Sequence, residues 1–267
     1  MEHNQWRPQG LIGVVHLPAM PGDPRATASF REIEAFAWRD AEHLARGGCD
    51  AIIVENFGSA PFPKGDPQNR IPPHQCALMA LFVRRCVAHL GLPVGVNCLR
   101  NDIFSALGIA AAADAAFVRV NVHTGAYLTD QGIIEGEAYA SLRYRQQLGQ
   151  EHVTICADIL VKHAAPLTPL DPQSATKDTL ERGLADAVIV TGQATGAPVD
   201  PARLAEVRAA AKNCPVIIGS GVSPQTLPVL KPHADAFIVG TWLKEEGKVA
   251  NPVDIDRVKE MSTLLRR

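Results

Sequence analysis

Residues 117–123 read Phe-Val-Arg-Val-Asn-Val-His and alternate strictly between two sides of the chain. The three valines fall on one side, and Phe117, Arg119, Asn121 and His123 fall on the other. A period of two residues indicates a β-strand. Because the valine face packs under helices, the three polar side chains indicate the inner wall of a barrel or a wet crevice. We expect Arg119 to lie deep, Asn121 to lie mid-wall and His123 to lie at the mouth.

A short apolar run followed by a helical segment occurs eight times along the chain. Uninterrupted strand–helix alternation predicts a parallel sheet, and eight units of this size favour a closed barrel. We therefore predict an α/β protein, a single-domain (β/α)8 TIM barrel over residues 1–267, with a core over about 11–243 and a last helix over about 254–265. The expected strands span 11–16, 51–55, 94–97, 117–121, 153–158, 187–191, 216–219 and 236–240.

Local sequence signals place several helix starts and strand starts. Ser29, with Glu32 three residues later, predicts a capping box. Asn101 is expected to cap an alanine-rich helix, and Ser223-Pro224 has the form of a cap followed by proline. Asp-Ala precedes four of the predicted strands, at residues 50, 114, 186 and 235, which supports a barrel built from repeated units.

Composition limits the classes of partner and compartment. The net charge is −2, with 46% hydrophobic and 20% charged residues, so we expect no nucleic-acid partner. No apolar run approaches the roughly 20 residues of a membrane span, and residues 1–9 lack the apolar core of a signal peptide. The six cysteines have no CxxC spacing, which favours a reduced, cytoplasmic location. Peripheral membrane contact and homo-oligomer formation stay open.

Side chains capable of chemistry cluster where the predicted strands end. The carboxyl ends of the strands form the working face of such barrels, so we expect these side chains to converge there. Asp158, Glu55, Lys162 and His123 are the candidate catalytic residues. The candidate substrate-binding residues are His16, Asn56, Asn97, Arg119, Asn121, His163 and Thr191.

Two glycine turns predict a phosphate site. Gly219, Ser220 and Gly221 follow the seventh predicted strand, and Gly240 and Thr241 follow the eighth. Glycine lets backbone amides approach an anion, and phosphate sites recur at these two strands in TIM barrels. The alternative is that the glycines only form tight turns.

The candidate catalytic residues have structural alternatives. Asp158 is expected to point into the barrel, either as a general base or as the partner of Arg119 in an internal ion pair. Glu55 is open to the same two interpretations. Lys162 is a nucleophile, a phosphate ligand or a surface charge. The loop 124–132 is either a mobile lid or an ordinary long loop.

A metal site is a further hypothesis. Side chains from separate strands could converge on a divalent ion, but they show no local ligand spacing. The residues concerned are His16, Glu55, His123, Asp158 and His163. We predict neither a metal site nor a cofactor.

Six motifs together resemble the BtpA/SgcQ family over nearly the whole chain. They are GVVHLPAMPG at 13–22, ENFG at 55–58, GVN at 95–97, RVN at 119–121, DILVKHA at 158–164 and VTG at 190–192. The resemblance implies a barrel of the ribulose-phosphate-binding type. It carries no assigned reaction, so the motif residues are implied only as site positions.

The family resemblance implies two kinds of function. One branch is linked to photosystem I biogenesis at a membrane, and another is grouped with sugar metabolism. The polar rim and the glycine turns favour an isomerase, lyase or hydrolase that acts on a small phosphorylated molecule, sugar-like or nucleotide-like. The alternative is a non-catalytic factor for the assembly of photosystem I or another membrane complex, which would use its outer surface.

Overall fold

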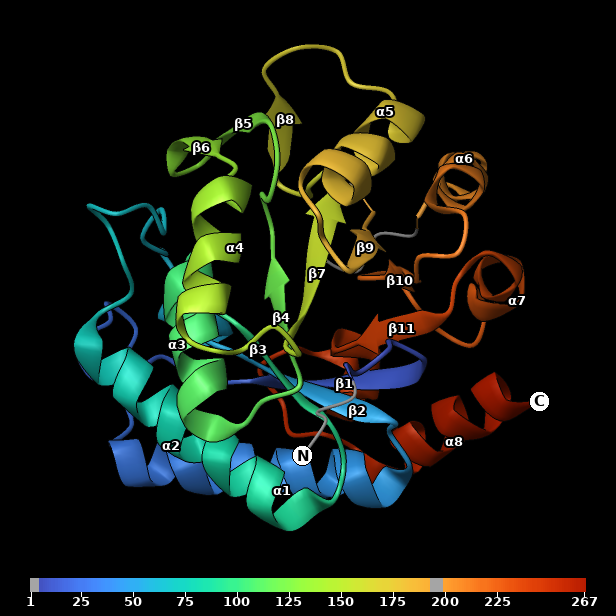
Figure 1. Ribbon diagram of the computed structural model, residues 1–267. Helices are drawn as coiled ribbons and strands as arrows, with labels where there is room; N and C mark the ends of the chain where they lie inside the picture. Colours follow the sequence, from blue (N-terminus) through green and yellow to red (C-terminus); the bar gives the residue numbers. More distant parts are fainter. Residues whose placement is uncertain (1–4, 193–198) are drawn as a thin grey trace.

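Eight parallel strands close into a barrel in the computed structural model, which describes residues 5–192 and 199–267 (Figure 1). The order around the barrel is β1-β11-β10-β9-β7-β4-β3-β2, which confirms the predicted TIM barrel. The barrel strands are β1 (Gly10–His16), β2 (Ala51–Glu55), β3 (Val94–Asn97), β4 (Phe117–Val120), β7 (Thr154–Ile159), β9 (Ala187–Val190), β10 (Val216–Ile218) and β11 (Ala236–Val239).

Helices cover the outside of the barrel (Figure 1). They are α1 (Phe30–Gly47), α2 (Pro73–Leu90), α3 (Ile103–Ala113), α4 (Ala138–Gln147), α5 (Pro172–Lys177), α6 (Pro201–Ala211), α7 (Leu227–Leu230) and α8 (Ile255–Arg266). A π-helical turn, Asp178–Arg182, continues α5, and short 3-10 turns span Phe57–Ser59, Lys231–His233, Thr241–Leu243 and Glu245–Gly247. In the described part of the chain, no helix combines the length and the apolar character needed to cross a membrane.

The capping box at Ser29 is confirmed, whereas two other predicted helix starts are wrong. Asp102, not Asn101, caps α3, because its carboxylate accepts a hydrogen bond from the Ser105 amide at 3.0 Å. The Asn101 side chain instead bonds the backbone of Val122. At Ser223 the chain forms a turn before α7, which begins only at Leu227.

The repeated Asp-Ala pairs have a structural role at the amino-terminal end of the barrel. Asp50, Asp186 and Asp235 each accept a hydrogen bond at 2.8 Å from an amide of the neighbouring strand. The donors are Leu11, Ile155 and Val216, respectively. A backbone amide that would otherwise lack a partner at the strand start is thereby satisfied. Asp114 differs, because it forms an ion pair with Arg84 on the surface.

Apolar side chains fill the amino-terminal half of the barrel interior. Phe117 is 1% exposed and stacks on Trp6, with ring centroids 4.2 Å apart. Gly95 has no side chain, and a Cβ there would clash with the Phe117 ring. The remaining residues of this inner cluster are Ile12, Val14, Ala51, Ile53, Cys156, Ala187, Ile189, Ile217, Ala236 and Ile238. Because this end is packed, space for a ligand lies at the carboxyl end of the strands.

A small second sheet stands above the barrel beside strands β4 and β7. It is antiparallel, in the order β6-β5-β8, and its strands are β5 (Ala126–Thr129), β6 (Gly132–Glu135) and β8 (Ala164–Pro166). The loop predicted over 124–132 is therefore largely a hairpin, with Asp130 at its tip. The helix α4 begins at Ala138, shortly after β6 ends at Glu135.

Candidate functional site

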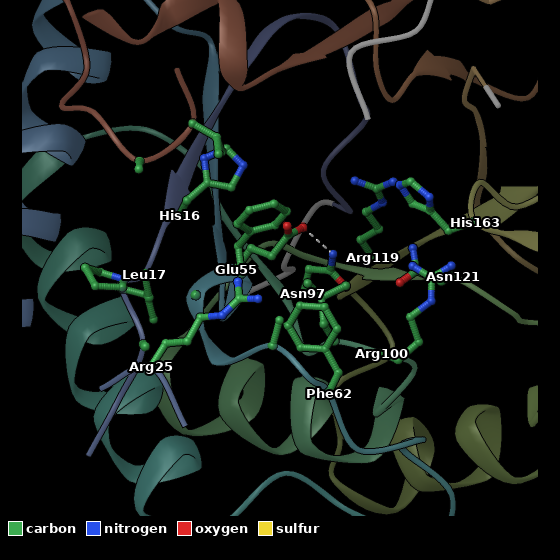
Figure 2. A pocket seen from close by; sticks show the side chains of 18 of the residues that line it. His16, Leu17, Arg25, Glu55, Phe62, Asn97, Arg100, Arg119, Asn121 and His163 are labelled. Carbon is green, nitrogen blue, oxygen red and sulfur yellow. Dashed lines mark hydrogen bonds between the residues drawn. The ribbon is translucent and has the colours of Figure 1, made fainter. Parts of the chain in front are cut away.

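Two adjoining cavities open at the carboxyl end of the barrel. The larger cavity measures about 770 Å³ and the smaller cavity about 280 Å³. Figure 2 shows side chains from several strands and loops directed into the larger one. Both cavities are lined by His16, Glu55, Phe57, Arg119 and Lys162. These five residues therefore form a shared wall, and one ligand that lies along it can occupy both cavities.

Four polar residues of the site lie in register on neighbouring strands. His16 is paired with Glu55, Glu55 with Asn97, and Asn97 with Arg119. Residues in register on parallel strands point to the same face, so all four side chains line the barrel interior at one level. Asn97 Nδ2 donates to Glu55 Oε2 at 2.5 Å (Figure 2). This bond fixes the orientation of a carboxylate that is 7% exposed.

Asp158 is the buried partner of Arg119. Its carboxylate accepts hydrogen bonds from Arg119 Nε and Nη2 and from Asn121 Nδ2, each at 2.9 Å. Burial acts to lower the pKa of Arg119, but the adjacent carboxylate outweighs it and raises the pKa. Arg119 and Asn121 line the larger cavity, whereas Asp158 lies behind them, against a separate space near Thr124 and Gly183. The contacts of Asp158 match the ion-pair alternative of the sequence analysis.

The imidazole of His16 and the amine of Lys162 both have lowered pKa values. For His16 the largest cause is burial, followed by the positive charges of Lys244, Lys162 and Arg119. His16 is therefore a neutral imidazole near pH 7, and its buried Nδ1 has no hydrogen-bond partner in the described residues. For Lys162 the largest cause is again burial, followed by repulsion from Arg119. The site thus holds a neutral hydrogen-bonding group and an amine that is unusually ready to lose its proton.

The two glycine turns meet at the smaller cavity. Gly219, Ser220, Gly221, Gly240 and Thr241 all line it. Gly221 has φ +73°, a conformation that favours glycine. A Cβ on Gly240 would lie 2.6 Å from His16 Cε1, so only glycine fits beside that ring. Within residues 5–192 and 199–267, no hydrogen bond engages the backbone amides at 221, 222, 241 and 242.

Three predicted substrate-binding or catalytic residues have other contacts. Asn56 is fully buried and bonds both backbone groups of Leu99. His123 does not stand at the mouth as expected, because β4 ends at Val120 and the strand alternation stops there. Its Nε2 lies 2.8 Å from the carbonyl oxygen of Gly183. Thr191 lines a different pocket, beside α6 and α7.

The histidines and carboxylates considered for a metal do not converge. His123 and Asp158 lie outside the larger and smaller cavities, whereas His16, Glu55 and His163 line the larger one. Within the described ranges, no three His, Cys, Asp or Glu side chains are grouped so that they could hold a metal ion.

Sequence reasoning missed Arg100 and the aromatic wall of the larger cavity. Arg100 is 6% exposed and follows β3 by three residues, outside any alternating pattern. Phe36, Phe57 and Phe62 add apolar surface, and Arg25 reaches the cavity from the side opposite to Arg100 and His163 (Figure 2). Phe36 lies in α1, and Phe57 and Phe62 lie in the segment between β2 and α2, so no single stretch of sequence marks this aromatic wall.

A closed parallel barrel with polar side chains around a cavity at its carboxyl end defines a TIM-barrel protein. Sequence comparison identifies the family within this class of protein. The chain belongs to the BtpA family, whose model matches residues 7–267.

Relatives span nearly the full chain. An uncharacterized protein of Pyrococcus furiosus is 46% identical over 93% of this chain and 92% of its own length. The photosystem I biogenesis protein BtpA of Synechocystis sp. is 45% identical over 93% of this chain and 85% of its own. The sgc region protein SgcQ of Escherichia coli is 29% identical, with 94% and 92% covered. These matches confirm the family resemblance.

Solved structures share the fold at low sequence identity. Phosphoribosyl anthranilate isomerase from Thermococcus kodakaraensis superposes with a TM-score of 0.56 and 13% identity, covering 97% of this chain and 99% of that one. Tryptophan synthase from M. tuberculosis gives a TM-score of 0.54 and 19% identity, covering 99% and 94%. Both neighbours are enzymes, but at these identities the likeness supports the barrel alone.

Proposed function

We propose that the protein is an enzyme that acts on a small phosphorylated molecule, sugar-like or nucleotide-like, and holds the phosphate at the turns after β10 and β11. One observation carries the proposal: four backbone amides without a partner among the described residues belong to two turns that line one cavity. Amides that approach from two sides bind phosphate oxygens well. The same cavity shares its wall with Glu55, His16 and Lys162, so a bound phosphate ester has its carbon skeleton beside groups that transfer protons.

The roles of the shared wall follow from its contacts. Glu55, oriented by Asn97, is the proton acceptor. Lys162 stabilises negative charge that develops on a substrate oxygen, and His16, as a neutral imidazole, donates a hydrogen bond to a hydroxyl or carbonyl. Asp158 accepts three hydrogen bonds from Arg119 and Asn121, so it supports the site through Arg119. This set suits an isomerase, a lyase or a hydrolase that begins with proton transfer.

Proton transfer can be measured before the product is known. The protein is incubated with a panel of aldose and ketose phosphates in D2O, and exchange of carbon-bound hydrogen is followed by NMR. We expect exchange with at least one phosphosugar and its loss in Glu55→Gln, while Glu34→Gln, an exposed carboxylate paired with Arg85, leaves it unchanged. Exchange that persists in Glu55→Gln contradicts the role of Glu55.

Phosphate binding is tested separately by thermal shift against phosphosugars and nucleotides, because a ligand stabilises the state that binds it. We expect stabilisation by phosphorylated compounds only, and its loss in Gly221→Val. If no phosphorylated compound raises the melting temperature, the proposal fails.

A non-catalytic role in assembly is the second candidate. It is favoured by the 45% identity to the Synechocystis protein named for photosystem I biogenesis. An assembly factor uses its outer surface and tolerates changes in the cavity. In a strain that lacks the gene, full rescue by a folded Glu55→Gln variant supports assembly, and failure of rescue supports a working site.

A further inference from the structure

Arg100 is a buried guanidinium that has no carboxylate partner among the described residues. Its side chain lines the larger cavity, and its Nη2 donates a hydrogen bond to the carbonyl oxygen of Lys162 at 2.6 Å. No ion pair engages it in the part of the chain that the structure describes. A guanidinium carries five N–H donors, and a buried charge without a counter-ion is costly. Arg119, the neighbouring buried arginine, shows the usual solution, with two bonds to Asp158.

The fold holds Arg100 in place through its backbone. The Asn56 side chain bonds Leu99, and the Arg100 amide donates to the carbonyl oxygen of Pro63 at 3.1 Å. Burial lowers the pKa of Arg100, and the carboxylates of Asp158 and Asp130 partly offset this effect. The charge is therefore positioned in advance, as in sites that bind an anion tightly.

The position of Arg100 separates it from the phosphate turns. Arg100 lines the larger cavity, whereas the glycine turns line the smaller one, and Lys162 borders both. A phosphate at the turns leaves the larger cavity to the rest of the ligand. That space has apolar walls at Leu17, Phe36 and Phe62, and its volume of about 770 Å³ is in the range of sites for ring-containing ligands.

We propose that the ligand carries two anionic groups: a phosphate ester at the glycine turns and, at the other end of an apolar ring, a carboxylate that pairs with Arg100. This inference rests on the proposed phosphate site and names the ligand class for it. Arginine suits the role because its planar donors match a carboxylate with two parallel bonds.

Matched ligands test the second anion directly. Phenyl, benzyl and phenethyl phosphate are compared with the same three compounds carrying a para-carboxylate, which varies the spacing between the anions. Binding is measured by calorimetry with the wild-type protein, Arg100→Gln and Arg84→Gln. Arg84 is an exposed arginine paired with Asp114 outside the site.

We expect the carboxylate to tighten binding about tenfold or more at one spacing, as charge-assisted bonds do. The gain disappears in Arg100→Gln, persists in Arg84→Gln, and the parent compounds bind equally well to all three proteins. If Arg100→Gln does not fold by circular dichroism, Arg100→Lys replaces it and reduces the gain at least threefold.

Two negative results have different meanings. If phenyl phosphate binds and Gly221→Val abolishes that binding, but the carboxylate adds less than twofold at every spacing or its gain survives in Arg100→Gln, the second-anion inference is wrong and the phosphate site stands. If none of the phosphates binds, the phosphate site fails and the two-anion ligand fails with it.

Discussion

Arg119 and Asp158 form an ion pair with two parallel hydrogen bonds inside the barrel. Arg119 Nε donates to Asp158 Oδ1 and Nη2 donates to Oδ2, both at 2.9 Å. The Arg119 side chain is 4% exposed and that of Asp158 is fully buried. The ion pair fixes the orientation of the Arg119 guanidinium, which lines the larger cavity.

Removal of Asp158 is expected to destabilise the protein strongly. Asp158→Ala leaves Arg119 buried without its counter-ion, which costs about 3–5 kcal/mol in comparable pairs. The double variant Arg119→Met with Asp158→Leu removes both charges and is expected to recover most of that loss. Urea unfolding measures both. A loss below about 1 kcal/mol in Asp158→Ala means that the pair is not a unit of stability.

The low pKa of His16 predicts loss of stability in mild acid. The unfolded chain takes up a proton near pH 6.5, whereas the folded protein resists protonation at this ring because of burial and nearby positive charges. Stability contributed by neutral His16 is therefore present above pH 6.5 and is lost as the pH falls below it. Unfolding free energies between about pH 7.5 and 5 should decrease less in His16→Gln than in wild type. His74→Gln, at an exposed histidine, should follow wild type.

The lowered pKa of Lys162 predicts that phosphate binding weakens early on the alkaline side. The charged amine attracts phosphate, and burial makes it lose its proton at a lower pH than an ordinary lysine. The affinity for phenyl phosphate should fall as the pH rises from about 7.5 to 10. Lys162→Arg keeps its charge over this range, so its affinity should stay flat. If the affinity declines equally in wild type and Lys162→Arg, a titrating group other than Lys162 causes the effect.

Four of the six cysteines should be unreactive in the folded protein. Cys49, Cys86, Cys98 and Cys156 are buried, and burial raises the pKa of Cys86 to about 12. Since the thiolate is the reactive form, a thiol reagent should modify at most the two half-buried cysteines, Cys76 and Cys214, before unfolding.

Mass spectrometry of the modified peptides identifies which cysteines have reacted. Cys214 should be modified before Cys76, whose pKa is raised by burial. Modification of Cys156 at a comparable rate would show that the barrel opens locally.

The alternation of residues 117–123 predicted the interior face of β4 correctly as far as Asn121. Period two is a property of an extended chain, so it identified the face that Arg119 and Asn121 share. It failed at His123, because the strand ends at Val120 and the following residues turn toward Gly183. A two-residue pattern has no means of marking where a short strand stops.

Sequence predicted the site residues that stand at strand ends, but not those whose contacts depend on distant parts of the chain. Glu55, Asn97 and the glycine turns follow directly from strand ends, and the structure brings them to the expected edge. Asn56 bonds the backbone of Leu99, a contact that the sequence did not indicate, because an asparagine that bonds a backbone has the same sequence signal as one that bonds a substrate. Arg100 carries no local signal, and only the absence of a carboxylate partner among the described residues draws attention to it. Whether a buried side chain has a partner depends on tertiary contacts, which a local sequence pattern does not reveal.

The pairing of β5 with β8 links the segments that follow two different barrel strands. Asp130 lies at the tip of the first segment and Lys162 precedes β8 in the second, and both border the larger cavity. We therefore expect a ligand that displaces Lys162 to shift the hairpin as well, through the backbone hydrogen bonds between β5 and β8. Leu128, in β5 and 54% exposed, is a natural attachment point for a fluorescent probe. The small sheet thus offers an optical reporter of cavity occupancy that needs no knowledge of the reaction.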